Sequence, residues 1–305
     1  MKTAKNKTLI VIVGPTAVGK TAMAIKLAQQ FSTEIISADS RQFYRELKIG
    51  VASPSLEELS LATHHFIGNL SIHDTYNVSK YETEALQCID EIFKTKEMAV
   101  LVGGSGLYID AVCKGIDELP DPEEELRENI KHLYATEGIT ALRSQLRLLD
   151  PVYCNEVDLA NPKRLMRAIE VCLTTGKPYS SFRVNQQTPR EFNIVKIGLS
   201  REREELYDTI NHRVDLMLEM GLLDEVKGLF PYKELNALNT VGYKEIFAYL
   251  ENECSLAEAI EKIKTNSRRY AKRQLTWFRR YDDITWFEAN NHTEIFDYLK
   301  IKLIK

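Results

Sequence analysis

The stretch LIVIVGPTAVGKT, Leu9 to Thr21, decides the fold. It fits the phosphate-loop pattern G-x-x-x-x-G-K-[ST]. An unbroken aliphatic run precedes the loop and apolar residues recur at helical spacing after it, so we expect a strand, a phosphate-binding turn and a helix. Backbone N–H groups freed by the glycines, the helix N-terminus and the Lys20 ammonium would all face an anion. The predicted phosphate loop consists of Gly14, Pro15, Thr16, Ala17, Val18, Gly19, Lys20 and Thr21, whose hydroxyl is suited to Mg²⁺.

Further buried strands follow the phosphate loop, separated by segments with helical periodicity. They start near Glu34, Met98 and Asn193, and the first two run into Asp39 and Ser105. This alternation predicts an α/β fold with a P-loop NTPase-like parallel sheet and helices on both faces. Ligands of such sheets bind at the carboxyl ends of the strands, where the phosphate loop, Asp39 and Ser105 all lie.

Residues 118–192 show helical periodicity and almost no strand signal. We therefore expect a helical insertion domain between residues 1–117, the first part of the core, and residues 193–305, its second part. Within the insertion, NPKRLMRAIEV begins at Asn161 and has the start signal of a helix. One side of that helix carries the basic residues Lys163, Arg164 and Arg167.

A second basic segment, KIKTNSRRYAKRQLTWFRR, runs from Lys262 to Arg280 without an acidic residue. Ile263, Tyr270 and Trp277 recur every seven residues, so the predicted helix packs this stripe and leaves its basic side chains outside. Alone, such a run indicates only a solvated helix face. Together with the basic insertion it suggests a polyanion held between the two, although the net charge of the chain is −4.

Composition limits the class of protein. The chain has 305 residues, 28% of them charged, and its N-terminal apolar run is too short for a membrane span. Its five cysteines form no C-x-x-C pair, so neither a zinc site nor a disulfide framework is indicated. We expect a cytoplasmic protein with no membrane contact, and nothing requires a protein partner or more than a monomer.

The phosphate loop alone is compatible with three kinds of protein. A P-loop kinase or NTPase would add a Mg²⁺-binding carboxylate at a strand end, for which Asp39 is available. A nucleotide-regulated binding protein would use the loop without chemistry. A transferase whose leaving group is diphosphate would use the loop to hold the donor, and would need no nucleoside triphosphate.

The chain as a whole resembles the tRNA dimethylallyltransferases, also called tRNA isopentenyltransferases, in their bacterial form. The resemblance rests on segments in the same order over nearly the full length. They are GPTAVGKT (14–21), ISADSRQFYRELKIG (36–50), HHFIG (64–68), VGGSGLYIDAV (102–112), LPDPEEELR (119–127), NPKRLMRAIEV (161–171), YDTINHRVDLMLEMGLLDEV (207–226), TVGYKEI (240–246) and RRYAKRQLTWFRR (268–280).

This resemblance implies transfer of a dimethylallyl group from dimethylallyl diphosphate to the exocyclic amine of the adenosine immediately 3′ of the tRNA anticodon. The phosphate loop would then hold the diphosphate leaving group. By similarity Asp39 is the general base, while Lys20, Arg213 and Mg²⁺ stabilise the charge that grows on the diphosphate. A carboxylate in this place also commonly binds the metal, so both roles of Asp39 stay open.

The resemblance also implies contacts with the anticodon stem-loop. They fall to Asp39, Ser40, Arg41, Gln42, Ser105, Arg127, Lys163, Arg164, Leu165, Met166 and Arg167. Relatives usually carry Thr where this chain has Ser105. The nearest alternative is an adenylate isopentenyltransferase that acts on free nucleotides, followed by a P-loop nucleotide kinase and a non-catalytic RNA-binding protein. Two separate basic segments favour tRNA, because a mononucleotide needs neither.

Overall fold

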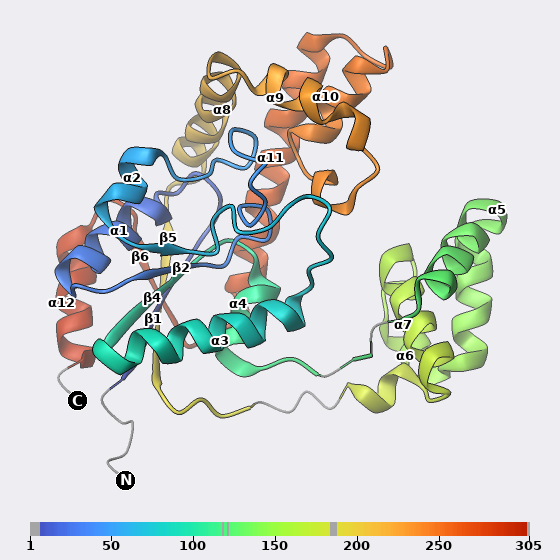
Figure 1. The fold of residues 1–305 in the computed structure, drawn as a ribbon, viewed down its shortest axis with the longest axis horizontal. Helices are drawn as coiled ribbons and strands as arrows, with labels where there is room; N and C mark the ends of the chain where they lie inside the picture. The colour runs from blue at the N-terminus through green and yellow to red at the C-terminus, as the bar shows by residue number, and fades with distance from the viewer. Residues whose placement is uncertain (1–6, 118, 121, 184–187, 304–305) are drawn as a thin grey trace. The chain divides into compact units, whose positions relative to one another are not determined.

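The computed structural model describes residues 7–117, 119–120, 122–183 and 188–303. Contacts divide the chain into two compact units (Figure 1). We call them the large unit, Met1–Cys113 with Pro189–Lys305, and the small unit, Lys114–Thr188. The small unit begins and ends a few residues before the insertion expected at 118–192.

Among the described residues, six strands form one sheet in the order β3-β2-β4-β1-β5-β6, and neighbouring strands pair in parallel. They are β1 (Thr8–Val13), β2 (Ile35–Ser37), β3 (His64–His65), β4 (Met98–Val102), β5 (Asn193–Ser200) and β6 (Ile284–Glu288). The central strand β1 is buried along its whole length, as its aliphatic sequence predicts for a strand covered on both faces.

Helices cover both faces of this sheet. The helices of the large unit are α1 (Lys20–Gln30), α2 (Leu56–Leu61), α3 (Val78–Thr95), α4 (Gly106–Lys114), α8 (Arg203–Glu219), α9 (Leu222–Leu229), α10 (Tyr243–Leu250), α11 (Leu256–Phe278) and α12 (His292–Leu303), with 3-10 turns η2 (Phe230–Tyr232) and η3 (Asn236–Leu238). Ile10 and Ile12 of β1 face a core that α1 and α12 complete. Leu9 and Val11 face the core under α3 and α4. The predicted parallel α/β sheet with helices on both faces is confirmed.

A third apolar cluster gathers α8, α9, α10 and α11 around Val226, Tyr243 and Ile263. Figure 1 shows α8, α9 and α10 together, with the long α11 running beside them. The chain between β2 and α2 joins the same cluster through Tyr44 and Leu47. This connection ties the segment that follows Asp39 to the C-terminal third of the chain.

The small unit is helical, with α5 (Glu124–Leu149), α6 (Pro151–Glu156), α7 (Pro162–Thr175) and the 3-10 turn η1 (Tyr179–Phe182). The carboxylate of Asp150 is fully buried. It accepts hydrogen bonds from the N–H groups of Tyr153 (2.9 Å) and Ser180 (2.6 Å) and from the Ser180 hydroxyl (2.9 Å). Because a buried carboxylate needs such donors, these bonds fix the start of α6 against η1.

Two strands, β3 and β6, are absent from the sequence-based expectation. β3 is only two residues long, which is too short to show an alternating pattern. β6 has the sequence ITWFE and directly follows the basic helix. In the part of the chain that the structure describes, no helix combines the length and apolar character that a membrane span requires.

Candidate active site

The phosphate loop leaves β1 through Gly14 and enters α1 through Gly19. Their φ angles are 149° and 106°, a region that glycine adopts readily and other residues avoid. A Cβ on Gly14 would lie 2.6 Å from the Leu199 carbonyl oxygen. The loop therefore packs directly on β5, and a larger residue at Gly14 would push it away.

A cavity of about 390 Å³, which we call the phosphate cavity, lies where the loop meets the carboxyl ends of β2 and β4. The loop lines it with Thr16, Ala17, Gly19, Lys20 and Thr21. The other loop residues have different tasks. Val18 is fully buried in the core, and the Pro15 carbonyl oxygen accepts a hydrogen bond from Lys20 Nζ at 2.7 Å.

Lys20 is a half-buried cation in the lining of this cavity. Burial lowers its pKa to about 7, Asp39 opposes that shift and Arg213 adds to it. The first turn of α1 adds partial positive charge at the same place. An anion bound here would restore the ordinary, charged state of Lys20.

Asp39 and Arg213 both line the phosphate cavity, although they lie far apart in the sequence. Asp39 follows β2, and its Oδ1 accepts a hydrogen bond from the Arg41 N–H at 3.0 Å. Arg213 comes from α8, and its NH1 lies 3.5 Å from Thr16 Oγ1. Burial lowers the pKa of Arg213, with Asp39 acting in the opposite direction. Two carboxylates, Asp39 and Glu58, thus line the cavity together with two half-buried cations and a helix N-terminus.

A second, smaller cavity of about 120 Å³ adjoins the phosphate cavity, and we call it the apolar cavity. The two share Thr16, Ala17, Asp39, Val51, Arg213 and Tyr270. Beyond these, its lining is largely aliphatic and includes Val214, Met217, Val241 and Ile263. A small apolar group attached to a phosphate would find both kinds of surroundings at this junction.

Gln274 of α11 holds the phosphate loop from the far end of the chain. Its Oε1 accepts a hydrogen bond from the Thr16 N–H at 2.8 Å, and its Nε2 donates to the Gly104 carbonyl oxygen at 3.0 Å. The side chain is buried. The sequence places Gln274 next to the packed stripe of the basic helix, and a polar amide there is the one signal that marks it.

The position of Tyr270 in the structure differs from the one that the sequence predicts. Its position in a seven-residue repeat suggested core packing, whereas the structure places it in the lining of both cavities. It shares a hydrogen bond with Ser105, and burial raises its pKa to about 12 with a smaller contribution from Asp39. The tyrosine is therefore a neutral wall beside Asp39.

The segment after Asp39 is held by the protein itself. Ser105 Oγ accepts a hydrogen bond from the Ser40 N–H at 3.0 Å. Arg41 NH1 donates to the carbonyl oxygens of Asn236 (2.8 Å) and Ala237 (3.1 Å). Gln42 Nε2 donates to the Ala52 carbonyl oxygen at 2.9 Å. Residues 40–42, expected to contact tRNA, thus also fix the position of Asp39.

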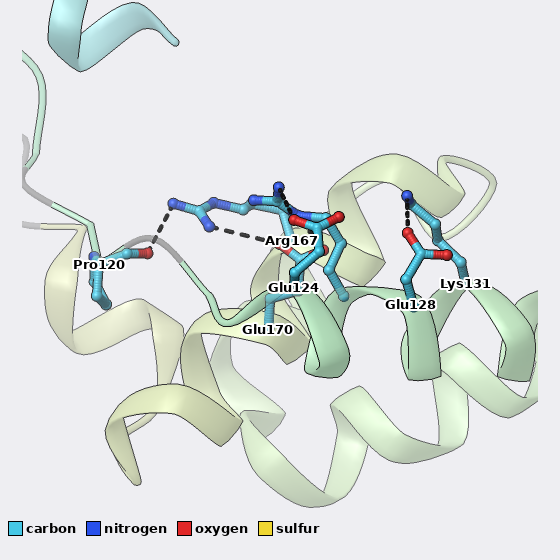
Figure 2. Close-up of polar contacts among 7 residues, drawn as sticks. Pro120, Glu124, Glu128, Lys131, Arg167 and Glu170 are labelled. Atoms are coloured by element: carbon cyan, nitrogen blue, oxygen red, sulfur yellow. Dashed lines mark hydrogen bonds and ion pairs between the residues drawn. The ribbon is translucent and has the colours of Figure 1, made fainter. Parts of the chain in front are cut away.

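In the small unit, two of the predicted tRNA contacts share one carboxylate. Arg167 NH1 lies 3.5 Å from Glu170 Oε2 and Arg127 Nε lies 4.0 Å from Glu170 Oε1. Arg167 NH2 also donates to the Pro120 carbonyl oxygen at 3.1 Å, as Figure 2 shows. Because Glu170 is buried, these arginines are held in place and partly neutralised.

The other predicted contacts of the small unit divide between surface and core. Lys163 and Arg164 are exposed on α7. Leu165 is completely buried, so its side chain is not available for the expected contact with tRNA. Met166 is half-buried and packs against the same core. Leu165 and Met166 therefore pack α7 against the core of the small unit.

Comparison with known proteins gives one consistent family. The family model described as IPP transferase matches residues 42–281 of this chain. A tRNA dimethylallyltransferase 1 of Bacteroides thetaiotaomicron is 52% identical over 295 residues, which cover 97% of this chain and 96% of that protein. The tRNA dimethylallyltransferase of Christiangramia forsetii is 52% identical over 97% of this chain and 98% of its own length.

Solved structures agree with this result. The full-length tRNA isopentenylpyrophosphate transferase of Bacillus halodurans has a TM-score of 0.72 and 38% identity, over 98% of this chain and 97% of that chain. A eukaryotic dimethylallyltransferase described as acting on tRNA has a TM-score of 0.79 and 28% identity, over 94% of this chain and 75% of that chain. The similarity therefore extends over both units.

The lowered pKa of Lys20 predicts that binding of inorganic diphosphate is coupled to proton uptake. Below its pKa of about 7, Lys20 is already charged in the free protein. Above it, Lys20 must gain a proton to pair with the anion, so affinity falls as the pH rises through this value. Calorimetry in buffers of different ionisation enthalpy measures the uptake.

The K20M variant provides the reference, because protons bound by diphosphate itself are common to both proteins. We expect the unaltered protein to take up about one proton more than K20M near pH 8 and about the same number near pH 6. If the two proteins take up the same number of protons at pH 6 and also at pH 8, Lys20 does not change its protonation state when diphosphate binds, and the prediction is wrong.

Proposed function

This chain belongs to the IPP transferase family, and from that premise we propose that it transfers a dimethylallyl group from dimethylallyl diphosphate to the exocyclic amine of the adenosine immediately 3′ of the anticodon in tRNA. The observation that carries this proposal is the position of the Asp39 carboxylate at the junction of the phosphate cavity and the apolar cavity. A base, an anion site and an apolar site thereby meet at one place.

The chemistry needs a base because the lone pair of an adenine amine is delocalised into the ring. In the proposed step the amine nitrogen forms a bond to C1 of the donor, and the bond between C1 and the diphosphate oxygen breaks. The amine proton passes to the Asp39 carboxylate and the electron pair of the broken bond leaves with diphosphate. Assistance by a positioned base is worth on the order of 10²–10⁴-fold in rate.

Charge grows on the diphosphate as this bond breaks. Lys20, Arg213 and the N–H groups at the start of α1 line the phosphate cavity and are already in place. Groups fixed in this way stabilise the transition state more than the ground state, because they need no reorganisation during the reaction. The aliphatic wall of the apolar cavity suits the five-carbon group and keeps water away from C1.

The residues at the site fit a magnesium ion. Mg²⁺ prefers oxygen ligands and often takes only one or two from the protein, with substrate phosphates and water supplying the rest. Thr21 and Asp39 both line the phosphate cavity, while no cluster of three His, Cys, Asp or Glu side chains in the described residues is placed to hold a metal alone. Bound with the donor, the ion would offset the negative charge of the diphosphate.

The tRNA side of the proposal rests on the surfaces of both units. The target adenosine would leave its stack and enter the site beside Asp39 and Tyr270, at a cost that a single-stranded loop keeps low. Exposed Lys163 and Arg164 on α7 offer contacts to phosphates. An adenylate isopentenyltransferase would share the chemistry but would not need these cations, so it is the alternative to be tested.

The direct test is incorporation of label from dimethylallyl diphosphate, with Mg²⁺, into an unmodified anticodon stem-loop and into free AMP, side by side. We expect label in the stem-loop alone. Label in AMP alone would identify an adenylate isopentenyltransferase, and label in neither would contradict prenyl transfer.

Replacing Asp39 with Asn tests the base. Asn keeps the size of the side chain but accepts no proton, so we expect turnover to fall by about 10²–10⁴-fold while stem-loop affinity stays within about threefold. The matched control is D208N, the same exchange at an exposed position of α8. Turnover of D39N equal to that of D208N would refute the assignment of the base.

Replacing both Lys163 and Arg164 with Ala tests the phosphate contacts. We expect weaker stem-loop binding and a slope of log affinity against log salt that is shallower by about one to two units, because fewer counterions are released. K131A is the control, since Lys131 belongs to the same unit but pairs with Glu128 at 2.5 Å (Figure 2). An unchanged slope in the double variant would show that Lys163 and Arg164 make no phosphate contacts with tRNA.

A further inference from the structure

Glu225 in the first turn of α9 accepts four hydrogen bonds, three from the backbone of one short loop and one from the side chain of Tyr243. Its Oε2 accepts from the N–H groups of Lys48 (3.1 Å) and Ile49 (2.8 Å). Its Oε1 accepts from the Gly50 N–H (3.0 Å) and the Tyr243 hydroxyl (2.7 Å). Three consecutive backbone N–H groups therefore point at one carboxylate, an arrangement that favours a negative charge.

Tyr243 completes this attachment. It is fully buried, and burial together with Glu225 raises its pKa far above the ordinary value, so its hydroxyl stays a donor. A Cβ on Gly50 would lie 2.6 Å from the Tyr243 ring. The loop thus lies flat on the ring, at a position where only glycine fits.

The same loop forms a wall of the reaction site. Gly50, Val51 and Ala52 line the apolar cavity, and Val51 also lines the phosphate cavity. From the other side, Gln42 Nε2 donates to the Ala52 carbonyl oxygen at 2.9 Å. Ala52 has a φ of 48°, a strained value for a residue with a Cβ, which persists only where the surroundings enforce it.

We propose that Glu225 is a positioning residue for prenyl transfer: it holds the loop Lys48–Ala52 as the wall that shapes the apolar cavity beside Asp39. This inference rests on the proposed function. Glu225 itself lies outside the lining of both cavities, so it acts through the loop and not on the reacting atoms. Its single carboxylate satisfies three loop N–H groups, which gives the wall one position instead of several.

The isosteric variant E225Q tests this role. Gln has one acceptor oxygen and an NH₂ group that faces donors, so at least two of the four hydrogen bonds are lost. We expect kcat for the stem-loop to fall by about tenfold to a hundredfold, since small displacements at a reaction site are costly. Because Lys20 and the phosphate loop are unchanged, affinity for inorganic diphosphate should stay within about threefold.

Amide hydrogen exchange reports the mechanism independently of activity. In E225Q the amides of residues 48–50 should exchange faster, while those of the phosphate loop and β1 stay as in the unaltered protein. D224N is the matched control, because it removes a carboxylate from the same turn of α9 where the side chain is 85% exposed and pairs only loosely with Lys227, at 3.6 Å. It should leave both readouts unchanged.

The outcomes separate the alternatives. A kcat of E225Q within twofold of D224N, or unchanged exchange at residues 48–50, would overturn the positioning role. A parallel loss of diphosphate affinity, kcat and thermal stability in E225Q would mean general damage to the fold and would also overturn the positioning role.

The variant Y243F removes one hydrogen-bond donor to Glu225 and keeps the carboxylate. We expect a several-fold fall in kcat from it even where E225Q folds poorly. If the unaltered protein transfers no dimethylallyl group to the stem-loop, the proposed function is refuted, and this inference is refuted with it.

Discussion

The structure depends on the charges gathered at the phosphate cavity, where Lys20 and Arg213 lie with two carboxylates, Asp39 and Glu58. Lys20 and Arg213 both lose solvation in the phosphate cavity, and the first turn of α1 adds its dipole to theirs. Asp39 is the one carboxylate whose attraction opposes both shifts. Such an arrangement costs stability in the free protein and returns it when an anion binds, so the loop, α8 and the strand ends must be held firmly around it.

Much of that support comes from residues far away in sequence, which sets the limit of what the sequence reveals. The phosphate loop, its strand and its helix form a local pattern, so Gly14 to Thr21 and the α/β sheet could be predicted. Gln274 and Glu225 could not, because each acts through a contact with a segment more than a hundred residues away, Thr16 and Lys48–Gly50 respectively. A seven-residue repeat identifies a buried side of α11, but it does not say whether Tyr270 faces a core or a cavity. Only the packed fold distinguishes the two.

The small unit shows a related limit. The sequence correctly marks α7 as basic, but it treats all the cations as equivalent. In the structure, Arg127 and Arg167 share the buried Glu170, whereas Lys163 and Arg164 are exposed. The paired arginines therefore have a fixed geometry, whereas the exposed Lys163 and Arg164 present their charge to solvent.

The bond between Thr16 and Gln274 has a consequence for how the protein is made. The phosphate motif is synthesised first, but β1 has no partner on one side until β5 is made, and the loop has no amide partner until α11 is complete. Contacts of such long range form late, since much of the chain must be ordered before they form. A growing or prematurely ended chain would therefore carry the motif without the site. The complete lining of the phosphate cavity, which includes Gln274, would arrive only with the last fifth of the polypeptide.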